Sequence, residues 1–249
     1  MVRDFAEHFS RLAEGYAEYR PRYPEALFAA IAAASPFRER AWDCATGTGQ
    51  AAQGLVMHFQ FVVASDASPE QLRAASPHPR IRYVVAQAEA APLASRSVGT
   101  VTVAQALPWL DLPRFYAEAR RILRPGGLVV VWTYGNLRVD GGAVDEILRD
   151  FYARVIGPYW APERRSVETG YRTLRFPFDE LAMEPPEMSA EWNLAQLLGY
   201  VGTWSAVARC REVTGSDPLA GLAEGLKEAW GASGDVRRIH WPIGLRAGR

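Results

Sequence analysis

The chain has 249 residues, of which 49% are hydrophobic, and this size suits one α/β domain that carries a cap or an insert. Lys and Arg together number 28 and match the 28 Asp and Glu residues, so the charge gives no indication of a nucleic-acid or membrane partner. Lys227 is the single lysine, and we attribute the excess of arginine to genomic composition before function.

The cysteines and histidines argue against a disulfide framework and against a metal site. Cys44 and Cys210 form no motif, and the four histidines show no ligand spacing. The N-terminus lacks the charged-then-apolar order of a signal peptide, and the longest apolar run, 26–34, is far short of the roughly 18 residues that span a bilayer. We therefore expect a cytoplasmic protein without a metal, whose partner is a small molecule rather than a nucleic acid or a membrane.

The first 36 residues are expected to form an N-terminal helical segment. Residues 4–19 are amphipathic and aromatic, and the prolines at 21 and 24 then hold Arg20 and Tyr23 in an extended stretch. Pro24 can serve as the first residue of a helix that runs to about Ser35.

Strands and helices alternate over residues 37–134. Short apolar strands are predicted at 40–43, 61–65, 81–85, 98–104 and 128–132. Ser68 and Gln71 form a capping box that starts a helix, and Asp111 starts another. The last of these strands is a continuous apolar run, which is typical of a strand covered on both faces. The alternation predicts an α/β fold with a doubly wound parallel sheet.

The alternation stops after residue 134. We expect residues 135–188 to form a helical cap or insert, and residues 189–249 to supply the C-terminal strands and helices that complete the core sheet. In that last part, helices are predicted at about 203–214 and 217–230, a strand near 189–192, and a final strand over 239–245.

The first predicted strand leads into a glycine-rich turn, Ala45-Thr-Gly-Thr-Gly49, and then a helix. Glycine permits positive φ and close approach of the backbone to a ligand, and a helix N-terminus favours a negative group. The sequence 47–52 also matches the G-x-G-x-x-A pattern of dinucleotide sites, so the glycines alone leave the cofactor undecided.

Residues at the ends of the predicted strands separate the cofactor classes. Asp43 lies inside the first strand, where dinucleotide sites normally carry a hydrophobic residue. Asp66 ends the second strand, where an acid can accept hydrogen bonds from both ribose hydroxyls. Ala88 and Glu89 follow the third strand, and Gln105 follows the fourth.

This ordered set resembles the class I S-adenosylmethionine-dependent methyltransferases, within the small-molecule (type 11) group that includes trans-aconitate methyltransferase-like proteins. The resemblance covers residues 40–134 and extends to 16–24, 203–205 and 241–242. It implies a Rossmann-like methyltransferase sheet of seven strands, the last of them antiparallel, and S-adenosylmethionine as the cofactor.

The resemblance also implies roles for individual residues. Asp43 and the turn would hold the methionine end of the cofactor, Asp66 the ribose, and Ala88 and Glu89 the adenine, while Gln105 would border the sulfonium. Arg20 would pair with the cofactor carboxylate. The full predicted cofactor set is Tyr16, Arg20, Asp43, Ala45, Thr46, Gly47, Gly49, Asp66, Ala67, Gln71, Ala88, Glu89 and Gln105, and Tyr23 and Trp109 are the predicted substrate contacts.

Two positions depart from the family pattern. Ala45 replaces the first glycine of the usual turn, which is tolerable if its φ is negative. Pro108 stands where relatives often carry a histidine, so no catalytic residue is assigned.

The implied reaction is an in-line methyl transfer to a small molecule. It needs a base only if the acceptor must lose a proton, so a carboxylate needs none and a hydroxyl can need one. An acidic acceptor would want arginines in the pocket, and residues 20, 22, 164 and 165 are the candidates. Two alternatives remain open: a non-catalytic S-adenosylmethionine-binding protein and an NAD-dependent oxidoreductase.

Overall fold

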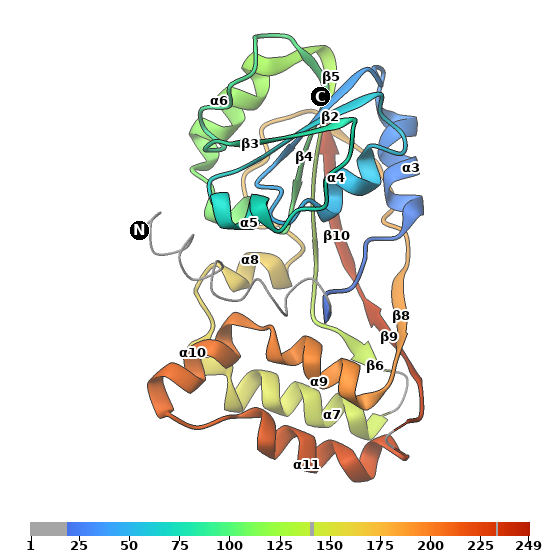
Figure 1. Ribbon diagram of the computed structural model, residues 1–249, viewed down its shortest axis with the longest axis vertical. Helices are drawn as coiled ribbons and strands as arrows, with labels where there is room; N and C mark the ends of the chain where they lie inside the picture. The colour runs from blue at the N-terminus through green and yellow to red at the C-terminus, as the bar shows by residue number, and fades with distance from the viewer. Residues whose placement is uncertain (1–18, 140–141, 233) are drawn as a thin grey trace.

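A seven-stranded sheet with helices on both faces makes up one half of the molecule, and a helical cap makes up the other half (Figure 1). The structure is a computed structural model that describes residues 19–139, 142–232 and 234–249. Tyr16 therefore lies outside the described residues. No helix in the described ranges is long and apolar enough to cross a membrane.

The core sheet has the strand order β3-β2-β1-β4-β5-β10-β7. Its strands are β1 (Arg40–Cys44), β2 (Phe61–Asp66), β3 (Ile81–Val85), β4 (Val98–Ala104), β5 (Leu123–Tyr134), β7 (Glu180–Leu181) and β10 (Ile243–Gly248). The first five strands pair in parallel, and β10 is antiparallel to both of its neighbours. The predicted seven-stranded doubly wound sheet with its last strand antiparallel is therefore confirmed.

Alternation along the strands gives the sheet two apolar faces, because successive side chains point to opposite sides. Ala41 packs with the helices α3 (Glu25–Ala34) and α4 (Gln50–Leu55). Trp42, the next residue, packs with α6 (Leu112–Ile122) on the other face. A further short helix, α5 (Pro69–Arg73), begins where the Ser68 hydroxyl accepts a hydrogen bond from the Gln71 backbone, as predicted for the N-cap. The reciprocal bond of the predicted capping box is replaced, because the Ser68 backbone N–H donates to Asp66.

The cap has its own apolar core, built around Trp204, Trp230 and Trp241. Its helices are α7 (Gly142–Asp150), a π-helical turn (Phe151–Val155), a 3-10 turn (Gly157–Tyr159), α8 (Arg164–Glu168), α9 (Leu194–Gly202), α10 (Ser205–Thr214) and α11 (Leu219–Trp230). A second sheet in the order β6-β9-β8 belongs to it, with β6 at Arg138–Val139, β8 at Met188–Trp192 and β9 at Arg237–Trp241.

The C-terminal part differs from the prediction in three ways. The expected final strand over 239–245 is two strands, because Pro242 separates β9 in the cap sheet from β10 in the core sheet. The helix α9 was not predicted, although Asn193 and Gln196 form a capping box at its start. Residues 135–188 supply the core strand β7, whereas most of 189–242 packs in the cap, so both predicted segments contribute to both halves.

Candidate functional site

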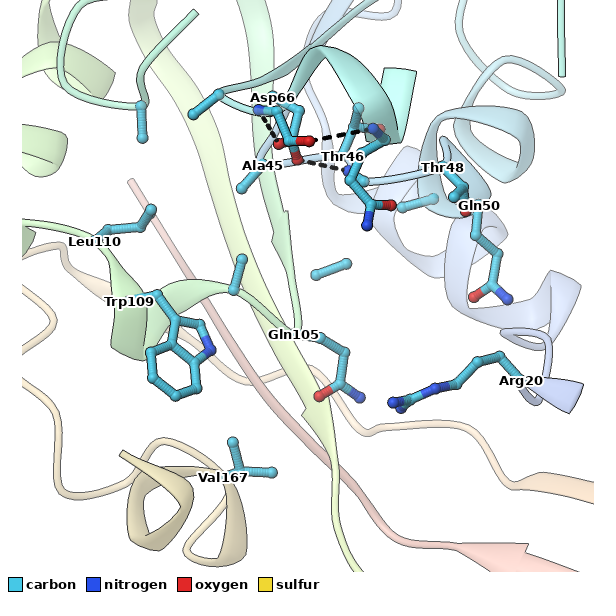
Figure 2. A pocket seen from close by; sticks show the side chains of 18 of the residues that line it. Arg20, Ala45, Thr46, Thr48, Gln50, Asp66, Gln105, Trp109, Leu110 and Val167 are labelled. Carbon is cyan, nitrogen blue, oxygen red and sulfur yellow. Dashed lines mark hydrogen bonds between the residues drawn. The ribbon is translucent and has the colours of Figure 1, made fainter. Parts of the chain in front are cut away.

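A cavity of about 1040 Å³ lies where the carboxyl ends of the parallel strands meet the cap. Its walls come from the segments that follow the first four strands, at residues 45–48, 66–68, 86–89 and 104–106, and from the cap. Ligands of doubly wound sheets bind at this edge, beside the point where the strand order reverses, here between β1 and β4. Figure 2 shows Ala45, Thr46 and Asp66 at one end and Gln105, Trp109 and Arg20 at the other. We call these the turn end and the cap end.

The turn after β1 contains three residues with positive φ. Ala45 has φ 54°, Gly47 58° and Gly49 83°. The expectation that Ala45 has negative φ is therefore wrong. An alanine in this region costs about 1–2 kcal/mol relative to the right-handed conformation. The turn keeps this conformation because its surroundings fix it: the Thr46 backbone N–H donates to the Ser65 carbonyl at 2.9 Å.

Gly47 and Gly49 each require glycine for a different structural reason. A Cβ added to Gly49 would lie 2.4 Å from the Tyr83 hydroxyl oxygen, so the side chain of β3 occupies that space. Gly49 does not line the cavity, and its close neighbour is Tyr83 rather than a ligand. Gly47 does line the cavity, and only its positive φ requires glycine, because an added Cβ would make an ordinary 3.7 Å contact with Gln71.

Asp43 supports the turn from inside the protein and does not line the cavity. Its side chain is fully buried, and its carboxylate accepts hydrogen bonds from the hydroxyls of Thr46 and, at 2.8 Å, Thr102. Burial raises the pKa of this carboxyl to about 6, and the charge of Asp66 adds to the rise, while the two hydroxyls oppose it. Asp43 is thus kept out of direct contact with the cavity, whereas Thr46, which it holds, does line the cavity.

Asp66 lies at the end of β2 and lines the cavity, as expected. Its Oδ2 accepts from the Gly47 backbone N–H at 2.8 Å, and its Oδ1 accepts from the Ser68 N–H at 2.9 Å (Figure 2). Burial raises the pKa of Asp66, and these backbone hydrogen bonds oppose the rise. The carboxylate therefore fixes the turn against the start of α5, and each oxygen keeps a second lone pair for a ligand.

The remaining predicted contacts at this end also reach the cavity. Ala67, Gln71, Ala88 and Glu89 all line it. The Glu89 carboxylate accepts from the Asp111 backbone N–H at 2.9 Å, so one of its oxygens already holds the loop before α6. Only part of the Glu89 carboxylate is left for adenine.

Gln105 lies directly after β4 and has φ 62°. Its Oε1 accepts from the Thr133 hydroxyl at 2.7 Å. Its Nε2 is buried and has no hydrogen-bond partner among the described residues. Gln105 thus brings an amide donor to the cap end of the cavity (Figure 2).

Arg20, Tyr23 and Trp109 also line the cavity. The Arg20 Nη1 donates to the Tyr134 hydroxyl at 2.9 Å, and its guanidinium lies 5.7 Å from the centre of the Tyr200 ring. Figure 2 shows Arg20 at the cap end, across from Gln105, and its neighbour Pro21 accepts a hydrogen bond from Gln50 at the start of α4. The pairing of Arg20 with the cofactor carboxylate stays a prediction. Arg22 is an exposed part of the rim.

Several cavity residues were not predicted as contacts. They include Thr48, Gln50, Tyr134, Trp160, Val167, Tyr200 and Trp204. Arg164, which the sequence offers only as one candidate among several arginines, lines the cavity, whereas Arg165 is exposed. The sequence offers one indication of the cap side of the cavity, the aromatic residues of 151–160. Aromatic residues are equally common in a cavity wall and in an apolar core.

The residues present fit S-adenosylmethionine. The cavity offers the Asp66 carboxylate, the backbone of the Ala45–Gly47 turn and the apolar side chain of Ala88 within one continuous space, which suits a ribose, a polar amino-acid end and a purine. No group of His, Cys, Asp and Glu in the described ranges could hold a metal ion.

Comparisons with known proteins agree with this geometry. Residues 42–131 match the family model of a methyltransferase domain. A solved structure from Anaeromyxobacter dehalogenans, named as a type II methyltransferase, is 47% identical, with a TM-score of 0.87 over 92% of this chain and 97% of that one. A protein of Dictyostelium discoideum named as a methyltransferase is 28% identical over 94% of this chain and 91% of its own length. A Mycobacterium tuberculosis protein, named as an uncharacterized methyltransferase, is 40% identical over 55% of this chain and 56% of its own.

The match to the Anaeromyxobacter structure extends across core and cap, whereas the domain match is confined to the core. The chain therefore belongs to the class I S-adenosylmethionine-dependent methyltransferases, and S-adenosylmethionine is its methyl donor.

Proposed function

We propose that the protein transfers a methyl group to a carboxylate of a small acidic molecule, forming a methyl ester. The observation that carries this proposal is that Arg164, which lines the cavity, forms no ion pair with a carboxylate of the described residues. A trans-aconitate methyltransferase-like subgroup, which the sequence motifs resemble, would also act on a carboxylate.

The direct hydrogen-bond partners of Arg164 are neutral, although the Tyr152 hydroxyl also donates to the exposed Glu168 carboxylate. Its Nε donates to the Tyr152 hydroxyl at 2.9 Å, and its Nη2 donates to the Asn136 Oδ1 at 2.6 Å. Its guanidinium lies 4.7 Å from the centre of the Trp160 ring. Within the described part of the chain, no carboxylate lies within ion-pair distance of Arg164. A half-buried arginine fixed in this way supplies a positive charge to a ligand carboxylate, which it can bind through two parallel N–H groups.

In the described ranges, the acidic side chains that line the cavity form no ion pair with Arg164. Among the described lining residues they are Asp66, Glu89 and Asp111. Each of them accepts a hydrogen bond from a backbone N–H, at Gly47, Asp111 and Arg114 respectively. Asp66 makes the turn end negative, and Arg20 and Arg164 bring positive charge to the cap, so an anionic acceptor is favoured beside Arg164.

Apart from the three carboxylates named above, each of which already accepts a backbone N–H, the described lining of the cavity offers no general base. Its described lining residues include no histidine, lysine or cysteine. Tyr200 lines the cap end, and its burial raises its pKa, so its hydroxyl stays protonated. A carboxylate arrives with its reacting lone pair already free and needs no base, unlike a hydroxyl or an ammonium group.

When bound, S-adenosylmethionine supplies a methyl group that its sulfonium already activates. The protein then has to align the acceptor oxygen and exclude water. Arg164 would orient the carboxylate, and the aromatic rings of Trp160, Tyr200 and Trp204 would exclude water around it. These rings favour an acceptor with a planar apolar body.

The experiment is a methyltransferase assay with a panel of aromatic and aliphatic acids, each paired with its amide. We expect turnover with at least one acid, a methyl ester as the product, and none with the paired amide. Arg164→Gln should raise the KM for the acid by about 10- to 100-fold, since a charge-assisted contact is lost. Arg165→Gln is the matched control, because that arginine is a neighbour on α8 but is exposed. Methylation of a neutral hydroxyl or amine by the unchanged protein, with every acid inert, would refute the proposal.

A further inference from the structure

Gln105 has a backbone conformation that is rare for a residue with a side chain. Its φ of 62° lies in the left-handed region, which residues other than glycine rarely adopt. Its backbone N–H donates to the Trp132 carbonyl at 2.9 Å, so the neighbouring strand β5 fixes the main chain at this point. Strained residues of this kind cluster at ligand sites, where the surrounding structure over-determines them.

The Gln105 carboxamide has a fixed direction. Thr133, which is fully buried on β5, donates its hydroxyl to the Gln105 Oε1 at 2.7 Å. The Nε2 must then point elsewhere, and it is buried without a hydrogen-bond partner among the described residues. A buried donor without a partner is costly and calls for a specific explanation. A ligand atom that accepts a hydrogen bond at this place would supply the missing partner.

Position and charge define that ligand atom. Figure 2 shows Gln105 at the cap end of the cavity, across from Arg20 and below the segment that carries Trp109. An N–H donor beside an arginine repels cationic and donor groups and attracts an oxygen with a free lone pair. A carboxylate oxygen meets this requirement, and two carboxylates could provide it: that of the acceptor and that of the cofactor's methionine end.

We propose that Gln105 is a specificity-determining residue for the acceptor: its Nε2 donates to a carboxylate oxygen of the acidic acceptor, and Thr133 is the positioning residue that aims it. This rests on the proposed acidic acceptor. Figure 2 shows Gln105 away from the turn that Asp66 holds, and the test below separates the acceptor carboxylate from the cofactor's methionine carboxylate. Gln105 and Arg164 then bind the acceptor from two separate segments of the chain.

The test measures binding rather than turnover. The full-length protein is saturated with S-adenosylhomocysteine and titrated by calorimetry with benzoate, a planar carboxylate, and with benzamide as the uncharged control. Gln105→Met keeps the length of the side chain and removes the donor, and Gln105→Glu places a negative charge at the same position. Thr133→Val removes the hydroxyl that aims the carboxamide. Gln60→Met is the matched control, because Gln60 is exposed and lies outside the cavity.

We expect Gln105→Met to weaken benzoate binding by at least tenfold and Gln105→Glu to weaken it further. Thr133→Val should weaken it by a smaller factor, and Gln60→Met should have no effect. The affinity for S-adenosylhomocysteine should stay within about threefold in every variant, which also shows that the variants fold.

Three outcomes would overturn the inference, and they are distinguishable. Unchanged benzoate affinity in Gln105→Met refutes the role of Gln105 alone. Weakened binding of S-adenosylhomocysteine with unchanged benzoate binding assigns the Gln105 contact to the cofactor carboxylate. Equal binding of benzoate and benzamide by the unchanged protein, or binding of neither, refutes the acidic acceptor and with it this inference.

Discussion

Replacing Asp43 with asparagine is expected to stabilise the protein at neutral pH. The Asp43 carboxylate is fully buried under the turn, and burial raises its pKa from 3.8 to about 6. Asparagine has nearly the same shape and carries no charge. Its Oδ1 can accept from one threonine hydroxyl, and its Nδ2 can donate to the other, so both contacts of Asp43 with Thr46 and Thr102 can be kept.

The magnitude follows from the two pKa values. Because the folded-state pKa lies above the unfolded value, the contribution of Asp43 to stability is fully present below about pH 3.8 and is lost as the pH rises through about 6. The free-energy advantage of Asp43→Asn should therefore grow from about 1 kcal/mol near pH 4.5 to about 3 kcal/mol near pH 7.

The assay is urea unfolding of the wild-type protein and Asp43→Asn at several pH values between about 4.5 and 7.5. The difference between the two free energies of unfolding reports the contribution of Asp43 ionisation to stability, since all other titrating groups are common to both proteins. A difference that does not change with pH, or a loss of stability near pH 7, would show that Asp43 is not a buried acid with a raised pKa. Because Asp43 does not line the cavity, the affinity for S-adenosylhomocysteine should change by less than about threefold.

Two further predictions concern the turn and its partner. Ala45→Gly should raise the melting temperature by about 1–2 °C, because relief of the positive φ slightly exceeds the entropy that glycine adds to the unfolded chain; a lower melting temperature would contradict the strain at Ala45. Asp66→Ala should weaken S-adenosylhomocysteine binding at least tenfold by calorimetry and lower stability by about 2–4 kcal/mol, because the Gly47 and Ser68 N–H groups lose their acceptor. Unchanged affinity in Asp66→Ala would mean that the ribose is held elsewhere, and exposed Glu224→Ala is its control.

Much of the core could be predicted because its signals are local. The five parallel strands, the helix start at Ser68 and the glycine turn each occupy 12 consecutive residues or fewer, and periodicity and capping chemistry report on such segments. The acids at the strand ends were predictable for the same reason, since parallel strands bring their carboxyl ends to one edge. Family membership now favours S-adenosylmethionine over the NAD alternative, which the glycine pattern alone left open.

The cap and the acceptor end of the cavity were decided by contacts between distant segments. Arg164 reaches the cavity because Asn136 and Tyr152 hold it, and Gln105 is aimed by Thr133, 28 residues away. No local pattern distinguishes Arg164 from its exposed neighbour Arg165. The helix α9 was missed although the Asn193–Gln196 capping box at its start was a local signal for it.

The turn after β1 illustrates both sides of this division. The sequence by itself determined that a strand would run into a tight glycine turn and a helix, because Gly47 and Gly49 permit left-handed backbone there. Only the tertiary structure decided that Ala45 shares this conformation, that Gly49 makes room for Tyr83, and that Asp43 lies beneath the turn rather than in the cavity. The physical reason is that backbone propensity depends on near neighbours, whereas strain and burial are set by the strands and side chains that packing brings against the turn.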